Sequence, residues 1–162
     1  MSDANVEPVA AREVALTRDF DAPARLLFET FRKPEYLKRW FGPKGWPLTL
    51  CEVDFRVGGR FRFAMTGPDG VQGASFGGEY LEIVPDHKIV YVIDTYAEPM
   101  IVTLTFEEQS GRTTLTYHTL FGSVAMKNRH LGVGFGAGVA SGLDQLAEVV
   151  AELQGLPGSA GD

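Results

Sequence analysis

Three histidines are the side chains of this sequence best suited to metal binding or acid–base chemistry: His87, His118 and His130. They fall in a predicted turn, at a strand end and just ahead of a helix, and they lack the short spacing typical of metal ligands. Four serines are candidates for nucleophiles: Ser75, Ser110, Ser123 and Ser141. None has the context of a nucleophile elbow, so neither group of residues indicates hydrolytic or metal-dependent catalysis.

The other reactive groups also favour structural roles. Cys51 lies in an alternating strand, where a small buried side chain is a better interpretation than a nucleophile. Glu107 and Glu108 end another strand and are interpreted as a solvated pair rather than a general acid and base. The alternating glycines of 132–136 follow no strand of a strand–helix–strand unit, so a dinucleotide site has little support. We therefore expect no catalytic residue, metal or cofactor.

Large apolar side chains favour a different function, the binding of a small molecule. In 60–65 the two arginines alternate with three apolar residues, which therefore share the opposite face of a strand. The same alternation in later strands, and helical spacing near the C-terminus, bring further apolar residues to this face. We expect a cavity lined by these residues: Phe61, Phe63, Met65, Val102, Leu104, Tyr117, Phe135, Val139 and Leu143. Ordinary core packing is the alternative for each of them.

Four amphipathic residues are candidates for the rim of this cavity: Trp40, Trp46, Tyr91 and Tyr96. Each has a large apolar body and a polar tip, which suits the edge of a binding site. Tyr91, Tyr117 and His118 are candidates for a polar contact with the ligand. His118 is the weakest of the three, because the alternation of its strand points it away from the cavity.

The elements that position these residues are predicted from the hydrophobic period. A strand is expected over 12–20, followed by short helices over 24–31 and 35–41. Asp21 and Pro23 supply an expected cap and first turn for the first helix, and Gly42 with Pro43 ends the second. Six strands follow at hairpin spacing, which predicts sequential antiparallel pairing: 48–55, 60–65, 73–84, 88–94, 100–108 and 112–120.

The last segment changes to a helical period. Its apolar stripe is spaced by three or four residues: Phe135, Val139, Leu143, Leu146, Val150 and Leu153. Five glycines lie between Gly132 and Gly142, and each costs up to about 1 kcal/mol relative to alanine in a helix interior. Two interpretations are open. Either another group approaches this backbone closely, or the segment is irregular and the regular helix begins near Ser141.

Length and composition fit one globular domain. The 162 residues are 44% hydrophobic and 22% charged, and one cysteine excludes a disulfide within the chain. We expect a domain over 12–154 with flexible tails over 1–11 and 155–162. The N-terminus does not resemble a signal peptide, and no apolar run is long enough to span a bilayer. These features predict a cytoplasmic protein without membrane contact.

The net charge of −6 disfavours nucleic acid as a partner. The charge is uneven, because residues 32–62 carry about +5 and the rest of the chain about −11. One interpretation is a basic patch that meets an acidic protein. The other is that these side chains form ordinary solvated faces of helices and strands.

Six short segments, in this order, resemble a known family over 12–154, nearly the whole chain. They are Phe20-Asp21-Ala22-Pro23 with Leu27-Phe28 after it; Trp40-Phe41-Gly42-Pro43; Asp54-Phe55-Arg56-Val57-Gly58-Gly59-Arg60-Phe61; Pro68-Asp69-Gly70; Gly78-Glu79-Tyr80-Leu81-Glu82-Ile83; and Leu143-Asp144-Gln145-Leu146. The chain resembles bacterial proteins similar to the C-terminal domain of the activator of the heat-shock chaperone ATPase, within the START-like, helix-grip superfamily. It departs from them at Gly134-Phe135, where family members tend to have Gly-Trp.

The resemblance implies an α+β fold in which a curved antiparallel sheet grips a long C-terminal helix. Two short helices follow the first strand, and a cavity lies between sheet and helix. Three classes of function are implied: binding of a small hydrophobic or amphipathic molecule, which we favour; contact with a chaperone; and a cyclase- or aromatase-like enzyme. Self-association as a homodimer is a further expectation that the sequence leaves open.

Overall fold

Seven strands form one antiparallel sheet in a computed structural model that describes residues 7–155. The sheet order is β1-β7-β6-β5-β4-β3-β2, so β2 to β7 pair sequentially, as the hairpin spacing predicts, and β1 joins β7. The strands are β1 (Glu13–Phe20), β2 (Leu48–Val53), β3 (Arg60–Met65), β4 (Phe76–Val84), β5 (Lys88–Ile93), β6 (Met100–Gln109) and β7 (Arg112–Phe121). The helices are η2 (Val9–Ala11, a 3-10 turn), α1 (Ala24–Arg32), α2 (Pro34–Trp40), α3 (Val124–Gly132) and α4 (Phe135–Leu153).

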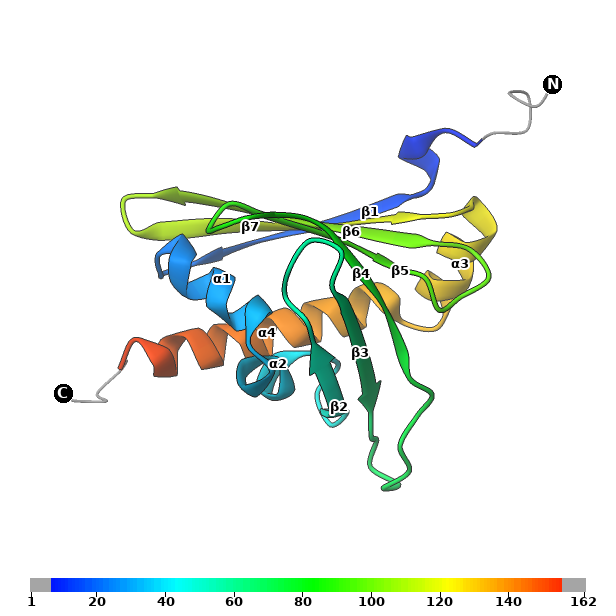
Figure 1. Cartoon of the computed structure of the whole chain (residues 1–162), viewed down its shortest axis with the longest axis horizontal. Coiled ribbons are helices and arrows are strands. Elements are labelled where there is room, and N and C mark those ends of the chain that lie inside the picture. Colours follow the sequence, from blue (N-terminus) through cyan, green and yellow to red (C-terminus); the bar gives the residue numbers. More distant parts are fainter. Residues whose placement is uncertain (1–6, 156–162) are drawn as a thin grey trace.

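The long helix α4 lies against one face of the sheet, with α1 and α2 beside it (Figure 1). At the far end of the sheet, β2 and β3 turn down toward α2, so the sheet curves around the helix (Figure 1). This is the predicted α+β helix-grip arrangement. None of the helices in 7–155 is long and apolar enough to cross a membrane.

Alternation along the strands explains which face carries the helix. From Met100 to Phe106 in β6 and from Thr113 to Phe121 in β7 every second residue is buried, while the residues between them are partly exposed. Leu104, Leu115 and Phe121 are fully buried and form one core cluster with Leu143 and Leu146 of α4. Removal of these apolar side chains from water is the main force that holds the helix on the sheet.

Three details of the predicted elements are wrong. The helix α3 was not expected as a separate element, because it has only one fully buried apolar residue, Met126, and so shows a weak helical stripe. Asp21 does not cap α1; the amide of Ala24 donates to Oε1 of Glu108 at 2.8 Å instead. The strand expected from residue 73 begins only at Phe76.

The boundaries predicted for the domain and its tails remain predictions. Residues 1–6 and 156–162 of the two tails lie outside the described part of the chain. Within the first tail, residues 9–11 form the turn η2, and a carboxylate oxygen of Glu7 accepts a hydrogen bond from the amide of Val124 at 2.9 Å.

Candidate functional site

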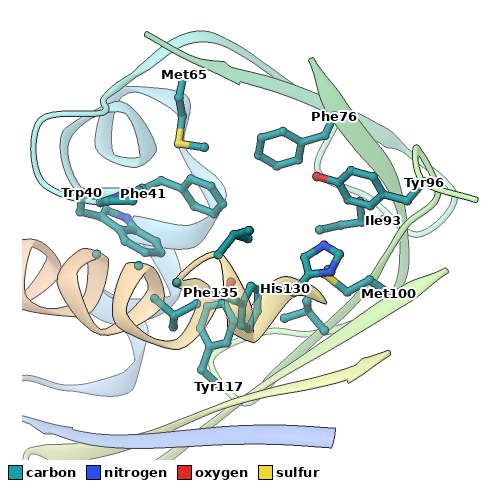
Figure 2. Close-up of a pocket in the computed structure, with 18 residues that line it drawn as sticks. Trp40, Phe41, Met65, Phe76, Ile93, Tyr96, Met100, Tyr117, His130 and Phe135 are labelled. Carbon is teal, nitrogen blue, oxygen red and sulfur yellow. The ribbon is translucent and has the colours of Figure 1, made fainter. Parts of the chain in front are cut away.

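A cavity of about 270 Å³ lies between α4, the loop after α2 and the inner face of the sheet. Seven residues that the sequence assigned to a cavity or its rim line it: Trp40, Met65, Tyr96, Val102, Tyr117, Phe135 and Val139. Figure 2 shows aromatic and methionine side chains arranged around this space. Two residues of the lining, Val133 and Tyr96, are 87% and 43% exposed, so the cavity opens to solvent on their side.

Trp40 contributes an apolar surface to the cavity, because the N–H of its indole ring already has a hydrogen-bond partner. Its Nε1 donates to the carbonyl of Thr30 at 2.9 Å, and the residue is only 3% exposed. The indole ring packs edge-to-face on Phe31 at 4.8 Å between centroids and lies 5.6 Å from the ring of Phe41. A buried tryptophan usually needs such a partner for its N–H. Its contribution to a ligand is therefore apolar contact rather than hydrogen bonding.

Two glycines of α4, Gly138 and Gly142, face the loop that follows Trp40. A methyl group built on Gly142 would lie 3.4 Å from the carbonyl oxygen of Trp40, and one built on Gly138 would lie 3.4 Å from Cγ of Pro43. The loop after α2 thus runs close over the helix backbone, as one interpretation of the glycine stretch held. The other interpretation is wrong about where the regular helix begins. It begins at Phe135 rather than near Ser141, and the irregular residue is Gly134, where φ is +93°.

The hydroxyl of Tyr117, a residue of the cavity lining, is paired with that of Tyr91. The hydroxyls of Tyr91 and Tyr117 lie 3.4 Å apart, at the long limit of a hydrogen bond. Burial raises the pKa of Tyr91 well above its ordinary value, and it raises that of Tyr117 as well. Tyr117 lines the cavity, whereas Tyr91 lies behind it. Both hydroxyls are therefore neutral at physiological pH and suited to hydrogen bonding.

Seven predicted residues do not line this cavity: Trp46, Phe61, Phe63, Tyr91, Leu104, His118 and Leu143. Four of them surround a separate apolar void of about 20 Å³ and pack as core, namely Phe61, Phe63, Tyr91 and Leu104. Leu143 is fully buried in the main core cluster. Trp46 is 43% exposed and covers Gly67, while His118 lies on the other face of the sheet and binds Oε1 of Glu13 at 2.6 Å.

The reactive residues outside the cavity have structural surroundings. Burial raises the pKa of the Cys51 thiol to about 11, which suppresses the thiolate needed for nucleophilic attack. Ser75 lies in a Gly-x-Ser-x-Gly pattern over 73–77, yet it leads into β4, and its Oγ accepts from Nε of Arg62 at 3.3 Å. Within residues 7–155 no three histidine, cysteine or acidic side chains come together in a group that could hold a metal ion.

The basic segment is largely paired with acids. Nη2 of Arg60 lies 2.8 Å from a carboxylate oxygen of Asp94, and Nε of Arg56 lies 3.0 Å from one of Asp54. The guanidinium of Arg62 lies 4.0 Å from the Glu52 carboxylate. These exposed pairs add little stability. Of the three acids, Asp94 alone lies outside 32–62, so its carboxylate reduces the positive field of the segment beyond the stated net charge.

Sequence reasoning missed several lining residues, among them Phe41, Phe76, Ile93, Met100 and His130. Phe41 lies in the quoted Trp-Phe-Gly-Pro segment, which is a usable signal. Ile93 and Met100 follow the same strand alternation as the residues that were named. His130 gave no signal, because it lies in α3, which was not expected as a separate element.

Comparison with known proteins gives a family match and many similar folds. Residues 21–151 match the family described as activator of Hsp90 ATPase homolog 1-like protein. Protein NE0264 from Nitrosomonas europaea is 26% identical with a TM-score of 0.81, covering 90% of this chain and 97% of that one. Protein CV1439 from Chromobacterium violaceum is 30% identical with a TM-score of 0.70, covering 86% and 97%.

A solved structure of lower sequence identity also shares the fold. An AHSA1-like protein from Aeromonas hydrophila is 19% identical with a TM-score of 0.69, covering 93% of this chain and 99% of that one, which shows a shared fold. No curated protein matches the chain. The match and the fold together indicate a START-like domain of a general ligand-binding or interaction class.

Proposed function

The chain belongs to the family of activator of Hsp90 ATPase homolog 1-like proteins, and from this premise we propose that it is a non-enzymatic domain that binds a small apolar or amphipathic molecule in the cavity against α4. The observation that carries the proposal is the cavity itself. Its wall is mostly aromatic and methionine side chains, and one side is open to solvent. A concave apolar site with a few polar groups is the usual form of a small-molecule site.

The volume limits the size of the ligand. A cavity of about 270 Å³ exceeds the roughly 150 Å³ that suffices for benzene, and it lies near the lower end of the range of about 300–1,000 Å³ for drug-sized ligands. A molecule of one or two rings, or a short acyl chain, is therefore the best fit. An aromatic group buries about 150–250 Å² and gains about 4–6 kcal/mol, so dissociation constants of about 1 mM down to tens of micromolar are expected.

Binding is favoured over catalysis by the chemistry of the wall. The described residues that line the cavity include no aspartate, glutamate, lysine or arginine, and their ionisable side chains are two tyrosines and one histidine. A cyclase- or aromatase-like reaction would have to rely on these groups alone. Protein–protein contact with a chaperone is the alternative to ligand binding. The ion pairs of Arg56 and Arg60 weaken the attraction of this surface to an acidic partner.

The proposal is tested by calorimetric titration with β-naphthol, a two-ring probe of suitable size. The variant Val139→Phe places a ring in the cavity, and Ala137→Phe places the same ring on an exposed position of α4. Wild type and Ala137→Phe are expected to bind the probe, and Val139→Phe is expected to lose binding while it still unfolds cooperatively. Equal binding by all three folded proteins would place the probe elsewhere and overturn the proposal.

A further inference from the structure

His130 lines the cavity and packs against a second lining residue, Tyr96. It lies in the last turn of α3. The His130 and Tyr96 ring centroids are 5.5 Å apart at an interplanar angle of 75°. Figure 2 shows both residues on the same side of the cavity, with the Tyr96 hydroxyl directed toward its centre. The two residues come from separate elements that the fold brings together at the site.

One hydrogen bond determines which nitrogen of His130 can accept a hydrogen bond from a ligand. Nδ1 lies 3.0 Å from the carbonyl oxygen of Met126, one turn earlier in the same helix. A carbonyl can only accept, so Nδ1 carries the hydrogen and donates it. In the neutral ring Nε2 is then a lone-pair acceptor. Within residues 7–155, Nε2 has no hydrogen-bond partner, so it is free to accept a hydrogen bond, and His130 lines the cavity.

The ring is also held in place by apolar neighbours. Its centroid lies 5.3 Å from that of Phe121 and 6.1 Å from that of Phe135. Phe121 is fully buried, so this side of the imidazole rests on the rigid core. A polar atom held in one orientation before binding costs little additional entropy when a ligand arrives.

The surroundings of His130 select against charged ligands. The described lining residues include no aspartate, glutamate, lysine or arginine, and the walls are largely apolar. An ion that entered would lose its hydration without a permanent opposite charge to replace it, which is costly. A hydroxyl group avoids this cost, because it can donate one hydrogen bond to Nε2 while the rest of the molecule stays in apolar contact.

We propose that His130 is the polar anchor of the cavity and that its Nε2 accepts a hydrogen bond from the hydroxyl group of an uncharged ring compound. This inference rests on the proposed function and names the chemical class of the ligand. The many aromatic side chains of the lining favour a planar ring system, because a ring ligand gains edge-to-face contacts with them in addition to burial. The two methionine sulfurs in the lining add favourable contacts with ring edges.

The test compares β-naphthol with its methyl ether, in which the ring system is kept and the hydroxyl can no longer donate. Wild type is expected to bind β-naphthol about fivefold more tightly than the ether, the size of one net hydrogen bond. His130→Phe keeps an aromatic ring but removes Nε2, and it is expected to bind both probes equally. His118→Phe, on the opposite face of the sheet, is the matched control and is expected to keep the preference. Tyr96→Phe tests the other polar group at this mouth, and the preference is expected to remain if Nε2 of His130 is the acceptor.

A direct measurement on the wild-type protein does not depend on the variants. The nitrogen NMR signal of His130 Nε2 is expected to shift when β-naphthol is added and to stay nearly unchanged with the ether. Equal affinity of wild type for both probes, or loss of the preference in Tyr96→Phe but not in His130→Phe, would overturn the assignment of His130 and leave the proposed function standing. Failure of wild type to bind either probe would overturn both.

Discussion

The side-chain amide of Gln145 donates a hydrogen bond to the carbonyl oxygen of Gly42 at 2.7 Å. The same nitrogen lies 3.1 Å from the carbonyl oxygen of Trp40. These contacts tie the loop after α2 to the middle of α4, although the residues are more than a hundred positions apart in the chain. The loop and the helix are two walls of the cavity, so Gln145 acts as a fixed link between them.

Replacement of Gln145 by leucine should destabilise the protein. The change removes two hydrogen bonds and leaves partly buried carbonyl groups with fewer partners, so the free energy of unfolding is expected to fall by about 1–3 kcal/mol. Denaturant unfolding measures this directly. Gln154→Leu is the control, because Gln154 also bonds a carbonyl, that of Asp21, but at an exposed position. Equal losses for the two variants would contradict the role given to Gln145.

Gly138→Ala should raise stability and weaken binding of β-naphthol. Alanine is favoured over glycine in a helix by up to about 1 kcal/mol, and the added methyl would lie at an ordinary contact distance of 3.4 Å from Pro43. It would also reduce the cavity, because Gly138 lines it. Gly136→Ala makes the same change off the lining, so it should stabilise the helix without weakening binding. Equal binding of β-naphthol by the two variants would contradict the place of Gly138 in the cavity wall.

The buried tyrosines should make the protein sensitive to alkali. Burial raises the pKa of Tyr91 well above the ordinary value of about 10, and it raises the pKa of Tyr80 and Tyr117 too. The neutral phenol is favoured in the folded protein, so stability is fully present below pH about 10 and is lost as the pH rises further. Tyrosinate absorbance should therefore rise together with unfolding. Smooth titration of all five tyrosines near pH about 10 in a folded protein would refute this.

The Cys51 thiol should react slowly while the protein is folded. Burial raises its pKa to about 11, and the positive charge of Lys38 offsets only part of this effect. An unfolded cysteine has a pKa of about 8.5, so at pH about 8 alkylation by iodoacetamide should be slower in the folded state on the order of 100-fold. Because Cys51 is the one cysteine of the chain, the rate reports a single site. Comparable rates in buffer and in denaturant would contradict the prediction.

The strands and the main helix could be predicted because burial imposes a period on the sequence. Residues such as Phe61 and Phe63 point inward in strict alternation with Arg60 and Arg62, and the structure places them so. The α4 stripe is equally regular. Alternation cannot separate a lining residue from a core residue, however. Leu104 and Val102 face the same side of β6, yet only Val102 lines the cavity.

The part of the site that could not be predicted depends on irregular backbone between helices and on long-range contacts. His130 lines the cavity from the last turn of α3, a helix with a weak apolar stripe that the left-handed Gly134 separates from α4, and a hydrophobic pattern does not encode this arrangement. The first turn of α1 also depends on a distant residue, because the amide of Ala24 donates to the carboxylate of Glu108, 84 positions later in the sequence. Such contacts are set by the tertiary fold rather than by neighbouring residues.

The most direct test of the account is an amide NMR titration of the full chain with β-naphthol. The cavity predicts saturable shifts at the amides of Gly42, Gly138 and Gly142, which line it from the loop and the helix. His118, on the opposite face of the sheet, should show no change. No saturable shifts at the three glycines, or shifts concentrated around His118, would contradict the claim that this cavity is the binding site.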